Sequence, residues 1–408
     1  MAGVTAETTS TRSQELIDLE ERWGAPNYHP LPVVVERAEG VWLYDVDGNR
    51  YLDCLSAYSA VNQGHAHPRI LQTMVEQAHR VTLTSRAFRN DQLPLFYQEL
   101  ATLCGMEMVL PMNTGAEAVE TAIKAARRYG YELKGIEQDR AEIIVCENNF
   151  HGRTTTIVGF SSDEAYREGF GPFTPGFVTI PFGDIEALRS AINPNTCGFL
   201  FEPIQCEAGI NIPADGYVRE ALELCRRENV LSIADEIQTG LGRTGKLFAC
   251  DHEDSRPDLY VLGKALSGGF YPVSAVVGPR RVLELFRPGS HGSTYGGNPL
   301  GCAVARSALA VLQDEGLVKR SAELGEWLLG KLRDELHHPA IKDIRGRGML
   351  IGIELDVPAR PFCEALQERR VLCKETHDHV IRFAPPLVVE REDLEFAIEQ
   401  VREVFATA

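Results

Sequence analysis

Short apolar runs alternate with amphipathic stretches from about residue 105 to about residue 280. Six runs have the length of buried strands, at residues 143–146, 177–180, 198–201, 231–234, 259–262 and 273–277. Several intervening stretches, such as residues 218–228, place apolar side chains at helical spacing. The pattern therefore predicts βα units that form a mostly parallel sheet, with helices covering both faces.

The two ends of the chain carry different patterns. Residues 12–60 combine a helical stretch with short strands, and the alternating segment 41–52 contains Asp47-Gly48, a strong hairpin signal. A stretch rich in glycine and proline at residues 288–299 precedes a long helical region at roughly residues 300–335. The remaining residues predict a smaller unit of strands and helices that runs to the end of the chain.

Composition and charge narrow the class of protein. The chain has 408 residues, 44% of them hydrophobic, which is enough for two or three units with sizeable cores. Its net charge of −17 disfavours nucleic acid and anionic membranes as partners, because both attract basic surfaces. No apolar run has the length of a membrane span, and the start lacks the apolar core of a secretion signal. Ten cysteines without a C-x-x-C pair fit a reducing compartment, so we expect a cytoplasmic protein.

A lysine and an aspartate directly follow two of the apolar runs. Lys264 comes after the run 259–262 and Gly263, and Asp235 ends the run 231–234. Open α/β sheets bind their ligands at this carboxyl edge. A pyridoxal phosphate enzyme needs such a lysine for its Schiff base and such an acid for the pyridine nitrogen. A structural ion pair fits these two segments equally well.

Three further segments carry candidate ligand contacts. Residues 113–117 begin a helical stretch with small side chains that suit a phosphate, although a plain helix cap is the commoner use of this motif. Phe150 and Arg153 follow the run 143–146, where they could stack on a flat cofactor and bind a carboxylate. Taken alone, a core phenylalanine and a surface arginine are the commoner outcome. Arg382 lies in an apolar strand and needs an anionic partner, from the protein or from a ligand.

Two other motifs suggest different chemistry and are disfavoured. Residues 240–246 fit the first seven positions of a nucleotide-binding P-loop, but Leu247 stands where a hydroxyl must bind magnesium. No strand leads directly into these glycines, so we expect a polar loop. The His-x-His pairs at 65–67 and 377–379 have no nearby cysteine or carboxylate set, so we expect no metal site.

Over about residues 27–405, the chain resembles the class III pyridoxal phosphate-dependent aminotransferases, most closely the ornithine δ-aminotransferases among them. The segments that carry the resemblance are Asn-Tyr-His-Pro-Leu-Pro at 27–32, Leu-Ser-Ala-Tyr-Ser-Ala-Val-Asn-Gln-Gly-His at 55–65, Ala-Asp-Glu-Ile-Gln-Thr-Gly at 234–240, Leu-Gly-Lys-Ala-Leu-Ser-Gly-Gly at 262–269 and His-Gly-Ser-Thr-Tyr-Gly-Gly-Asn-Pro at 291–299.

The resemblance implies a fold of type I within the pyridoxal phosphate enzymes. A large α/β domain, residues 58–300, would contain a mostly parallel seven-stranded sheet. A smaller α+β domain would be built from both chain ends, residues 1–57 and 301–408.

The resemblance also implies a cofactor site for pyridoxal 5'-phosphate. Lys264 would hold the cofactor and move the proton, and Asp235 would pair with the pyridine nitrogen. Gln238 would contact the ring hydroxyl, and Phe150 would stack on the ring.

The phosphate contacts implied by the resemblance come from two subunits. Gly115 and Ala116 would bind the phosphate through backbone amides. Ser293 and Thr294 would reach the phosphate of the partner subunit, which makes a homodimer part of the active site.

The implied reaction transfers the δ-amino group of L-ornithine to 2-oxoglutarate by ping-pong chemistry. Arg153 and Arg382 would bind the two carboxylates of glutamate, and Arg153 alone would bind the carboxylate of ornithine. Glu207 matches the glutamate that covers the second arginine when ornithine is bound. Tyr28 and Tyr58 would line the ornithine end of the pocket.

Two positions depart from the pattern. Cys206 stands where glycine is usual, and His151 stands where a bulky aromatic residue is frequent. The alternative substrates are therefore acetylornithine, 4-aminobutyrate or another ω-amine. From other classes, a P-loop protein lacks the required hydroxyl, and an idle binding protein would not need Lys264 and Asp235 together.

Overall fold

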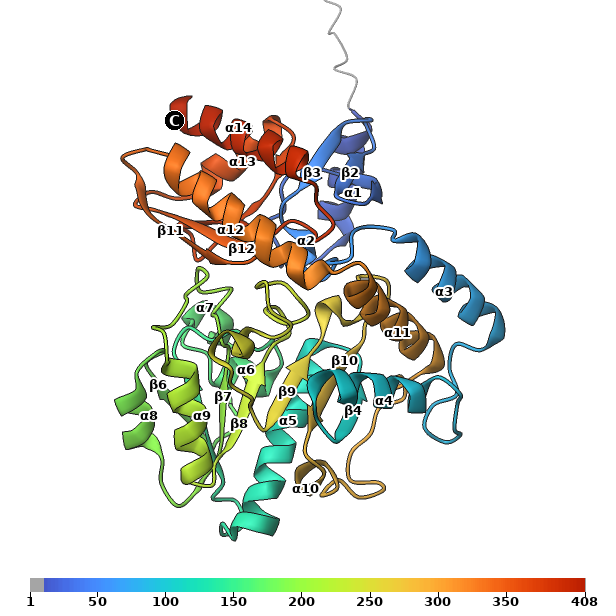
Figure 1. The fold of residues 1–408 in the computed structure, drawn as a ribbon, viewed down its shortest axis with the longest axis vertical. Helices are drawn as coiled ribbons and strands as arrows, with labels where there is room; N and C mark the ends of the chain where they lie inside the picture. The colour runs from blue at the N-terminus through green and yellow to red at the C-terminus, as the bar shows by residue number, and fades with distance from the viewer. Residues whose placement is uncertain (1–10, 408) are drawn as a thin grey trace, which may run out of the picture.

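The computed structural model describes residues 11–407, which form three sheets and the helices around them (Figure 1). The largest sheet has seven strands in the order β4-β10-β9-β8-β7-β5-β6. β10 runs antiparallel to both of its neighbours, and the other adjacent pairs are parallel. The bounds of the strands are β4 Met108–Met112, β5 Glu142–Cys146, β6 Phe177–Ile180, β7 Thr196–Phe201, β8 Leu231–Asp235, β9 Leu259–Leu262 and β10 Ser274–Gly278.

Both faces of this sheet are buried. Ile143 and Val145 of β5 pack in one apolar cluster with helix α5 (Gly115–Tyr129). Ile144 and Cys146, on the opposite face, pack in a second cluster that includes helix α9 (Tyr217–Arg227). Successive side chains of a strand point to opposite faces, so a sheet buried on both sides needs uninterrupted apolar runs. The predicted mostly parallel, doubly covered sheet is confirmed.

The other two sheets combine segments from both ends of the chain. The first joins β1 (Val35–Glu39), β2 (Trp42–Asp45) and β3 (Arg50–Asp53) to β13 (Val371–Leu372), which pairs in parallel with β3. The second is antiparallel and contains β11 (Ile341–Arg347), β12 (Leu350–Leu355), β15 (Val380–Phe383) and β14 (Lys374–Thr376). The hairpin predicted around Asp47-Gly48 is confirmed as β2 and β3. The domain boundaries at residues 57 and 300 stay a prediction.

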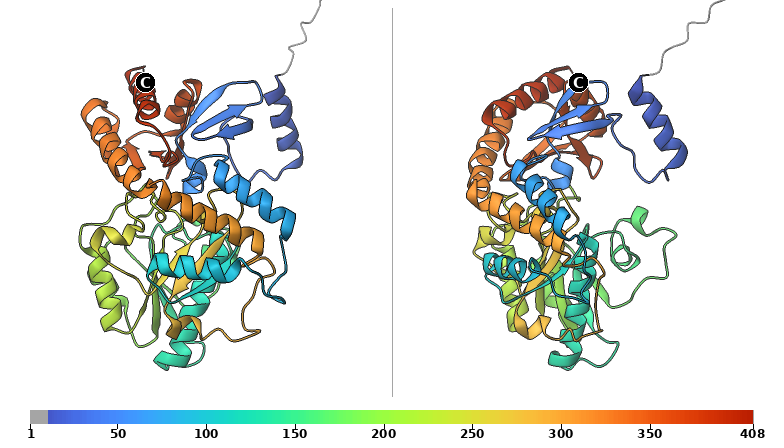
Figure 2. Two further views of the ribbon diagram at one scale, coloured as in Figure 1. Left: turned by 45° about the vertical axis from the view of Figure 1, so that its right-hand side comes forward. Right: turned by 90° about the vertical axis from the view of Figure 1, so that its right-hand side faces the viewer.

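Helices surround the large sheet and the two smaller sheets. Figure 1 shows the smaller sheets and the last helices above the large sheet, and Figure 2 shows α1 at the side of the upper layer. The predicted helical region at 300–335 forms α11 and α12, which are separated at Gly316. The remaining helix bounds are α1 Arg12–Trp23, α2 Ser56–Ser59, α3 Pro68–Arg80, α4 Leu93–Cys104, α6 Thr155–Gly159, α7 Glu164–Arg167, α8 Ile185–Ala191, α10 Arg280–Leu283, α11 Pro299–Asp314, α12 Leu317–Glu335, α13 Arg360–Glu368 and α14 Arg391–Thr407. Within residues 11–407, no helix is both long and apolar enough to cross a membrane.

Candidate active site

A cavity of about 140 Å³ lies where the parallel strands of the large sheet end. It brings together six of the residues predicted to hold the cofactor: Gly115, Ala116, Phe150, Asp235, Gln238 and Lys264. His151, Glu202 and Cys206 also line it. The carboxyl ends of neighbouring parallel strands meet at one edge, which explains why residues so distant in sequence share one cavity.

Lys264 is presented by a strained turn directly after β9. Its φ is +42°, in the left-handed region that side chains other than glycine rarely adopt. Such strain persists where the surrounding structure holds it, and it concentrates at functional sites. Lys264 has no ion pair with any described residue, and Asp235 is bound to His151 instead. The structural ion pair considered for Lys264 and Asp235 is therefore not formed.

Asp235 is held by two donors. His151 Nδ1 lies 2.7 Å from Asp235 Oδ2, and the Ile237 N–H donates to Asp235 Oδ1 at 3.1 Å. Burial alone lowers the pKa of His151, but the hydrogen bond and the charge of Asp235 outweigh it and leave that pKa raised. His151 therefore donates to Asp235 and fixes the position of its carboxyl group. A pyridine nitrogen can keep its proton beside such an aspartate.

Glu202 contributes a second buried carboxyl to this cavity. It directly follows β7, and its Oε2 accepts the Phe150 N–H at 3.0 Å. Burial raises the pKa of Glu202 to about 8. The negative charge of Asp235 also raises this pKa, whereas the positive charge of His151 lowers it. The neutral form of Glu202 is therefore favoured near neutral pH. Neither it nor His151 was predicted to take part in the site.

The start of α5 is a capped helix end that also suits a phosphate, the two uses considered for residues 113–117. Thr114 Oγ1 accepts the Glu117 N–H at 3.3 Å, and Glu117 Oε2 accepts the Thr114 N–H at 2.8 Å, so a helix cap is formed. The cap leaves the N–H groups of Gly115 and Ala116 without partners among the described residues, at the positive end of the helix. These two groups remain suited to a phosphate.

Arg382 is enclosed by protein groups on the other side of the cavity. It is 1% exposed, and its Nη1 and Nη2 donate to Glu207 Oε1 at 2.9 Å and Oε2 at 2.8 Å. Gln238 Oε1 accepts a further bond from Nη1 at 2.9 Å. Burial would raise the pKa of Glu207, but the charge and hydrogen bonds of Arg382 lower it to about 2. The pair is thus ionised and closed.

Tyr58 covers this ion pair from a strained turn. Its ring centroid lies 5.1 Å from Arg382 Cζ. All four residues of α2 have positive φ, with Tyr58 at +60°. Ser56 Oγ donates to the Ala384 carbonyl at 2.5 Å, and Asp53 Oδ1 accepts the Ser56 N–H at 2.8 Å. These bonds hold a conformation that presents Tyr58 to Arg382.

Arg153 is open, in contrast to Arg382. It follows Gly152, which lines the cavity, and its Cζ lies 3.9 Å from the ring centroid of Tyr166. No carboxylate in the described part of the chain forms an ion pair with it. Its charge is therefore available to an anionic ligand.

Three predicted residues lie away from this cavity within the single chain. The side chain of Tyr28 is 76% exposed. Ser293 Oγ accepts from Asn113 Nδ2 of its own chain at 3.0 Å, and Thr294 is exposed. Their predicted roles are not tested by this arrangement and stay predictions.

Residues 23–405 match the aminotransferase class-III family. The chain belongs to the class III aminotransferases. The ornithine aminotransferase of Geobacillus sp. (strain WCH70) is 62% identical to it over 396 residues, 97% of this chain and 99% of the relative. The structure of the ornithine aminotransferase from Toxoplasma gondii, which holds PLP at partial occupancy, has a TM-score of 0.96 at 45% identity and covers 97% of this chain and 94% of that one.

A relative with another substrate name is almost as similar. The acetylornithine aminotransferase from Elizabethkingia anophelis has a TM-score of 0.89 at 47% identity and covers 98% of this class III aminotransferase and 100% of its own chain. Among the solved structures, identities of 47% and 45% do not separate the two substrates, whereas the 62% identity to the Geobacillus relative favours ornithine.

The segment that resembles part of a P-loop has a structural role in this class III aminotransferase. Arg243, within residues 240–246, has no exposed surface. It donates to the carbonyls of Met349 at 2.9 Å and Pro385 at 2.6 Å, and to Asn62 Oδ1 at 2.5 Å. These acceptors belong to segments from both chain ends, so Arg243 joins them to the large sheet. The loop expected to be polar is largely buried.

The histidines at 65 and 67 have separate carboxylate partners. His65 Nε2 lies 2.7 Å from Asp53 Oδ2, and His67 Nε2 lies 2.9 Å from Glu315 Oε1. Across residues 11–407, no group of three or more histidine, cysteine, aspartate or glutamate residues is arranged to hold a metal ion.

Cys206 precedes Glu207 and has no exposed surface. It is fully buried in a small apolar cluster with Ile204, Ile210, Leu350 and Ala384. The side chain that replaces the usual glycine is thus accommodated beneath the closed Glu207–Arg382 pair.

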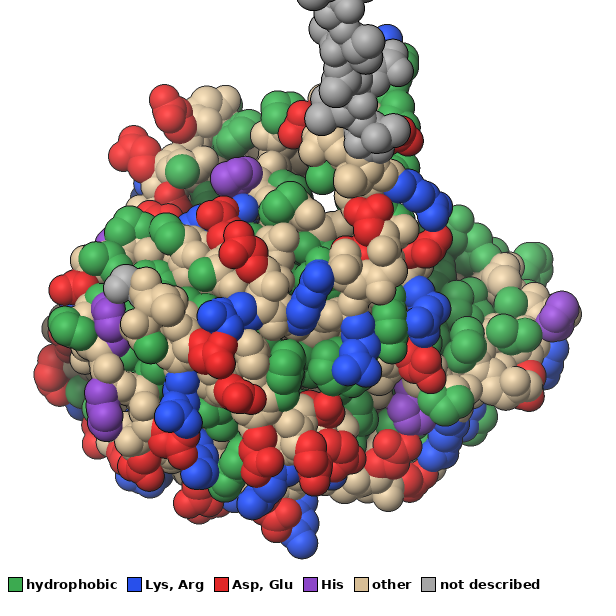
Figure 3. Space-filling model, turned by 90° about the horizontal axis from the view of Figure 1, so that it is seen from above, with side chains coloured by type: hydrophobic (Ala, Val, Ile, Leu, Met, Phe, Trp, Pro, Cys, Tyr) green, Lys and Arg blue, Asp and Glu red, His purple; other side chains and the backbone are tan. Residues whose placement is uncertain are grey.

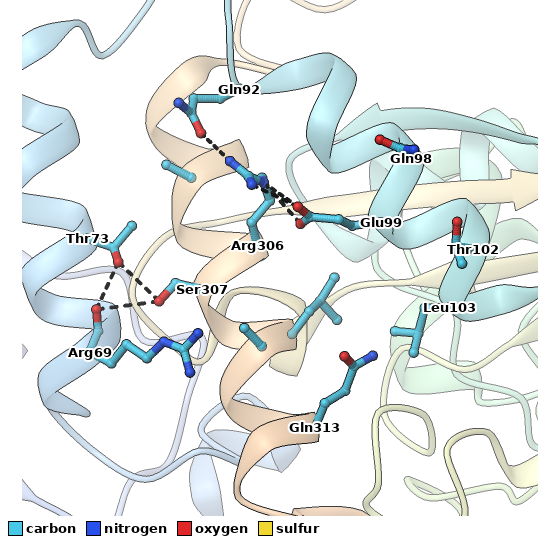
Figure 4. Close-up of a pocket in the computed structure, with 13 residues that line it drawn as sticks. Arg69, Thr73, Gln92, Gln98, Glu99, Thr102, Leu103, Arg306, Ser307 and Gln313 are labelled. Carbon is cyan, nitrogen blue, oxygen red and sulfur yellow. Dashed lines mark hydrogen bonds and ion pairs between the residues drawn. The ribbon is translucent and has the colours of Figure 1, made fainter.

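A larger depression of about 950 Å³ lies between α3, α4 and α11, away from this chemistry (Figure 4). Arg306 faces Glu99 and Gln92 there, with Nη2 2.8 Å from Glu99 Oε1 and Nη1 2.7 Å from Gln92 Oε1. Arg69 is paired with Asp314 at 2.5 Å. Because its charges already have partners, this depression lacks the free arginine that marks the active site.

Proposed function

We propose that this protein is an ornithine δ-aminotransferase that uses pyridoxal 5'-phosphate. It converts L-ornithine and 2-oxoglutarate to glutamate 5-semialdehyde, which cyclises to pyrroline-5-carboxylate, and L-glutamate. The observation that carries the proposal is the state of the two arginines: Arg153 is open, whereas Glu207 neutralises Arg382.

This arrangement fits a substrate with one carboxylate and two amines. Ornithine places its α-carboxylate on Arg153, which leaves the δ-amine at the reacting end. No anion of ornithine needs Arg382, and an unpaired buried arginine would be costly, so Glu207 covers it. Glutamate has two carboxylates and needs both arginines, so Glu207 must turn away in the second half-reaction.

The cavity fits the cofactor of this class. When bound, pyridoxal phosphate supplies an electron-accepting ring that stabilises negative charge on the substrate carbon. Lys264 would hold it through Nζ, and Asp235, fixed by His151, would face its ring nitrogen. Phe150 would cover the ring, and the free N–H groups of Gly115 and Ala116 would bind the phosphate.

The reaction then depends on one proton-transferring group. Lys264 Nζ removes a proton from Cδ of ornithine in the first half-reaction and returns one to Cα of the second substrate. Gln238, which bonds both Arg382 and Glu207, lies between the cofactor cavity and the carboxylate site. It couples the position of Glu207 to the occupied cavity.

The rival substrates are N-acetylornithine and 4-aminobutyrate. Tyr58 favours ornithine, because its ring closes the space beside Arg382 and offers a hydroxyl to the free α-amine. Tyr28 would contribute a second hydroxyl at the same end. An acetyl group at this amine would have to displace both rings.

We further infer that two copies of this chain form a dimer. Exposed apolar side chains gather on α3, on the segment before α4, on α4 and on the loop that carries Thr294: Leu71, Val75, Phe88, Leu95 and Tyr295. Seen from above, hydrophobic side chains cluster on the side where α3 lies (Figure 3). Apolar patches of this kind mark protein interfaces.

In this dimer, Thr294 and Ser293 would reach the phosphate bound by the partner subunit. Thr294→Ala should therefore weaken cofactor binding without separating the subunits. Cofactor titration and sedimentation measure these two outcomes.

The charge and cysteines agree with a cytoplasmic location. All ten cysteines are buried free thiols, which suits a reducing compartment.

The proposal is tested by mixing cofactor-loaded protein with L-ornithine, N-acetylornithine or 4-aminobutyrate, without keto acid. We expect rapid loss of the visible cofactor absorbance with ornithine and trapping of pyrroline-5-carboxylate as the product. A faster change with either other amine would contradict the substrate assignment and leave the class assignment intact.

A further inference from the structure

The segment between α6 and β6 carries an aromatic residue that no motif singled out. It includes α7 and projects from the body of the protein on the same side as α1 (Figure 2, right). Asp163 Oδ1 accepts the Ala165 N–H at 2.9 Å and begins this short helix. Tyr166, in its third position, is half-buried and turned toward Arg153.

Tyr166 and Phe150 form an aromatic corner for Arg153. The guanidinium carbon lies 3.9 Å from the Tyr166 ring centroid and 5.7 Å from that of Phe150. The two rings are 6.1 Å apart and nearly perpendicular, at 77°. An arginine at such a site gains attraction from the ring face, and the N–H groups at its edge stay free for a carboxylate.

The absence of an ionic partner makes this contact important. Arg382 is fixed by Glu207, but Arg153 has no carboxylate partner within residues 11–407 and is exposed. A long side chain that is free to rotate loses entropy when it binds a ligand, and preorganisation reduces that loss. We propose that Tyr166 is a positioning residue that holds Arg153 in place to bind a carboxylate of the substrate, the only one of ornithine or one of the two of glutamate. This inference rests on the proposed function, since it concerns the same substrates.

The decisive comparison uses an amine that lacks the carboxylate. 1,4-Diaminobutane is ornithine without its α-carboxylate, so it cannot use Arg153. In Tyr166→Leu, we expect the ratio of kcat/KM for ornithine to that for 1,4-diaminobutane to fall about 3- to 10-fold, mostly through the KM for ornithine. Calorimetric titration of ornithine into the same variant in a Lys264→Ala background should show a similar loss of affinity.

Two variants provide the controls. Tyr166→Phe keeps the ring face and should retain the wild-type ratio within about twofold, because the stack needs no hydroxyl. Phe170→Leu removes an exposed aromatic from the same segment, without a ring contact to Arg153, and should behave as wild type. In an Arg153→Gln background, Tyr166→Leu should lower the ratio no further.

Equal losses for both amines in Tyr166→Leu would overturn the inference, as would a Tyr166→Phe variant that resembles Tyr166→Leu. Failure of the proposed function has a different signature, because it appears in the wild type as the lack of a preference for ornithine over N-acetylornithine.

Discussion

Arg382 and Arg153, the two arginines proposed to bind substrate carboxylates, differ in what surrounds their charges. Arg382 comes from the buried strand β15 and is held by both oxygens of Glu207 and by Gln238. Arg153 comes from an exposed loop after β5 and rests on the face of Tyr166. A buried arginine needs protein acceptors wherever no ligand supplies them, and for Arg382 the main acceptor is the carboxylate of Glu207, whereas an exposed arginine can be solvated by water. Under the proposed function, this difference lets the site receive substrates with one carboxylate or with two.

Glu207 and Glu202 likewise differ in what surrounds their carboxyl groups. Glu207 faces Arg382, and its pKa is lowered to about 2 despite burial. Glu202 has no arginine, and burial raises its pKa to about 8. At neutral pH, Glu207 is therefore ionised and the neutral form of Glu202 is favoured, because only Glu207 has an arginine partner.

The largest effect should come from removing the chemistry while both arginines remain. Lys264→Ala should lower turnover by at least about 10³-fold, because the proton-transferring base is lost. Both half-reactions should be measured by stopped flow, with cofactor content checked by absorbance after dialysis. Residual transamination within tenfold of the wild type would contradict the role of Lys264.

The difference between the two arginines should disappear when the carboxylate that pairs with Arg382 is removed. Glu207→Ala should raise the ratio of the glutamate to the ornithine half-reaction by about 10-fold or more, because Arg382 no longer needs to be uncovered. Glu207→Gln, which keeps hydrogen bonds without the charge, should give an intermediate ratio. If both variants leave the ratio unchanged, Glu207 does not mask Arg382.

A smaller shift should follow from changing the ring beside Arg382. Tyr58→Ile should move the preference among amines by about 10-fold, from ornithine toward N-acetylornithine and 4-aminobutyrate, because the ring and hydroxyl are lost. Tyr58→Phe separates the two contributions, since it removes the hydroxyl alone. An unchanged preference, measured as kcat/KM for each amine, would weigh against the ornithine assignment.

The smallest effect on substrate choice should come from Glu202. Its pKa is higher in the folded than in the unfolded protein, so the folded state binds more protons between about pH 4.5 and pH 8 and loses stability as pH rises through that window. The Glu202→Gln variant has no group that titrates at this position, so it does not lose stability in this way, and its side chain can still accept the Phe150 N–H. Denaturant unfolding should therefore show the variant gaining stability on the wild type from pH 5 to pH 8, with substrate preference unchanged. A constant difference across this range would contradict the raised pKa.

Sequence patterns predicted the parts of the site that strands deliver directly. Asp235 and Lys264 come just after predominantly apolar runs, so the edge of the sheet could be located from them. β4 was missed because Pro111 lies within its apolar run. It is an edge strand of the large sheet, where a proline is tolerated.

The missed residues depend on contacts between distant segments. His151 reaches Asp235 across 84 positions, and Tyr166 meets Arg153 only because its segment folds back. Glu202 did have a usable signal, because it ends the run 198–201 as Asp235 ends the run 231–234. Thr294 lies outside the cavity of the single chain, so its predicted role depends on the proposed partner.

The two arginines are compared most directly by the rate constants of both half-reactions in two variants: Arg153→Gln, and the charge-balanced Arg382→Gln/Glu207→Gln. The account predicts that Arg153→Gln impairs ornithine and glutamate alike, whereas the double variant impairs glutamate by at least tenfold more than ornithine. Equal impairment of the two substrates in the double variant would contradict the assignment of Arg382 to the second carboxylate.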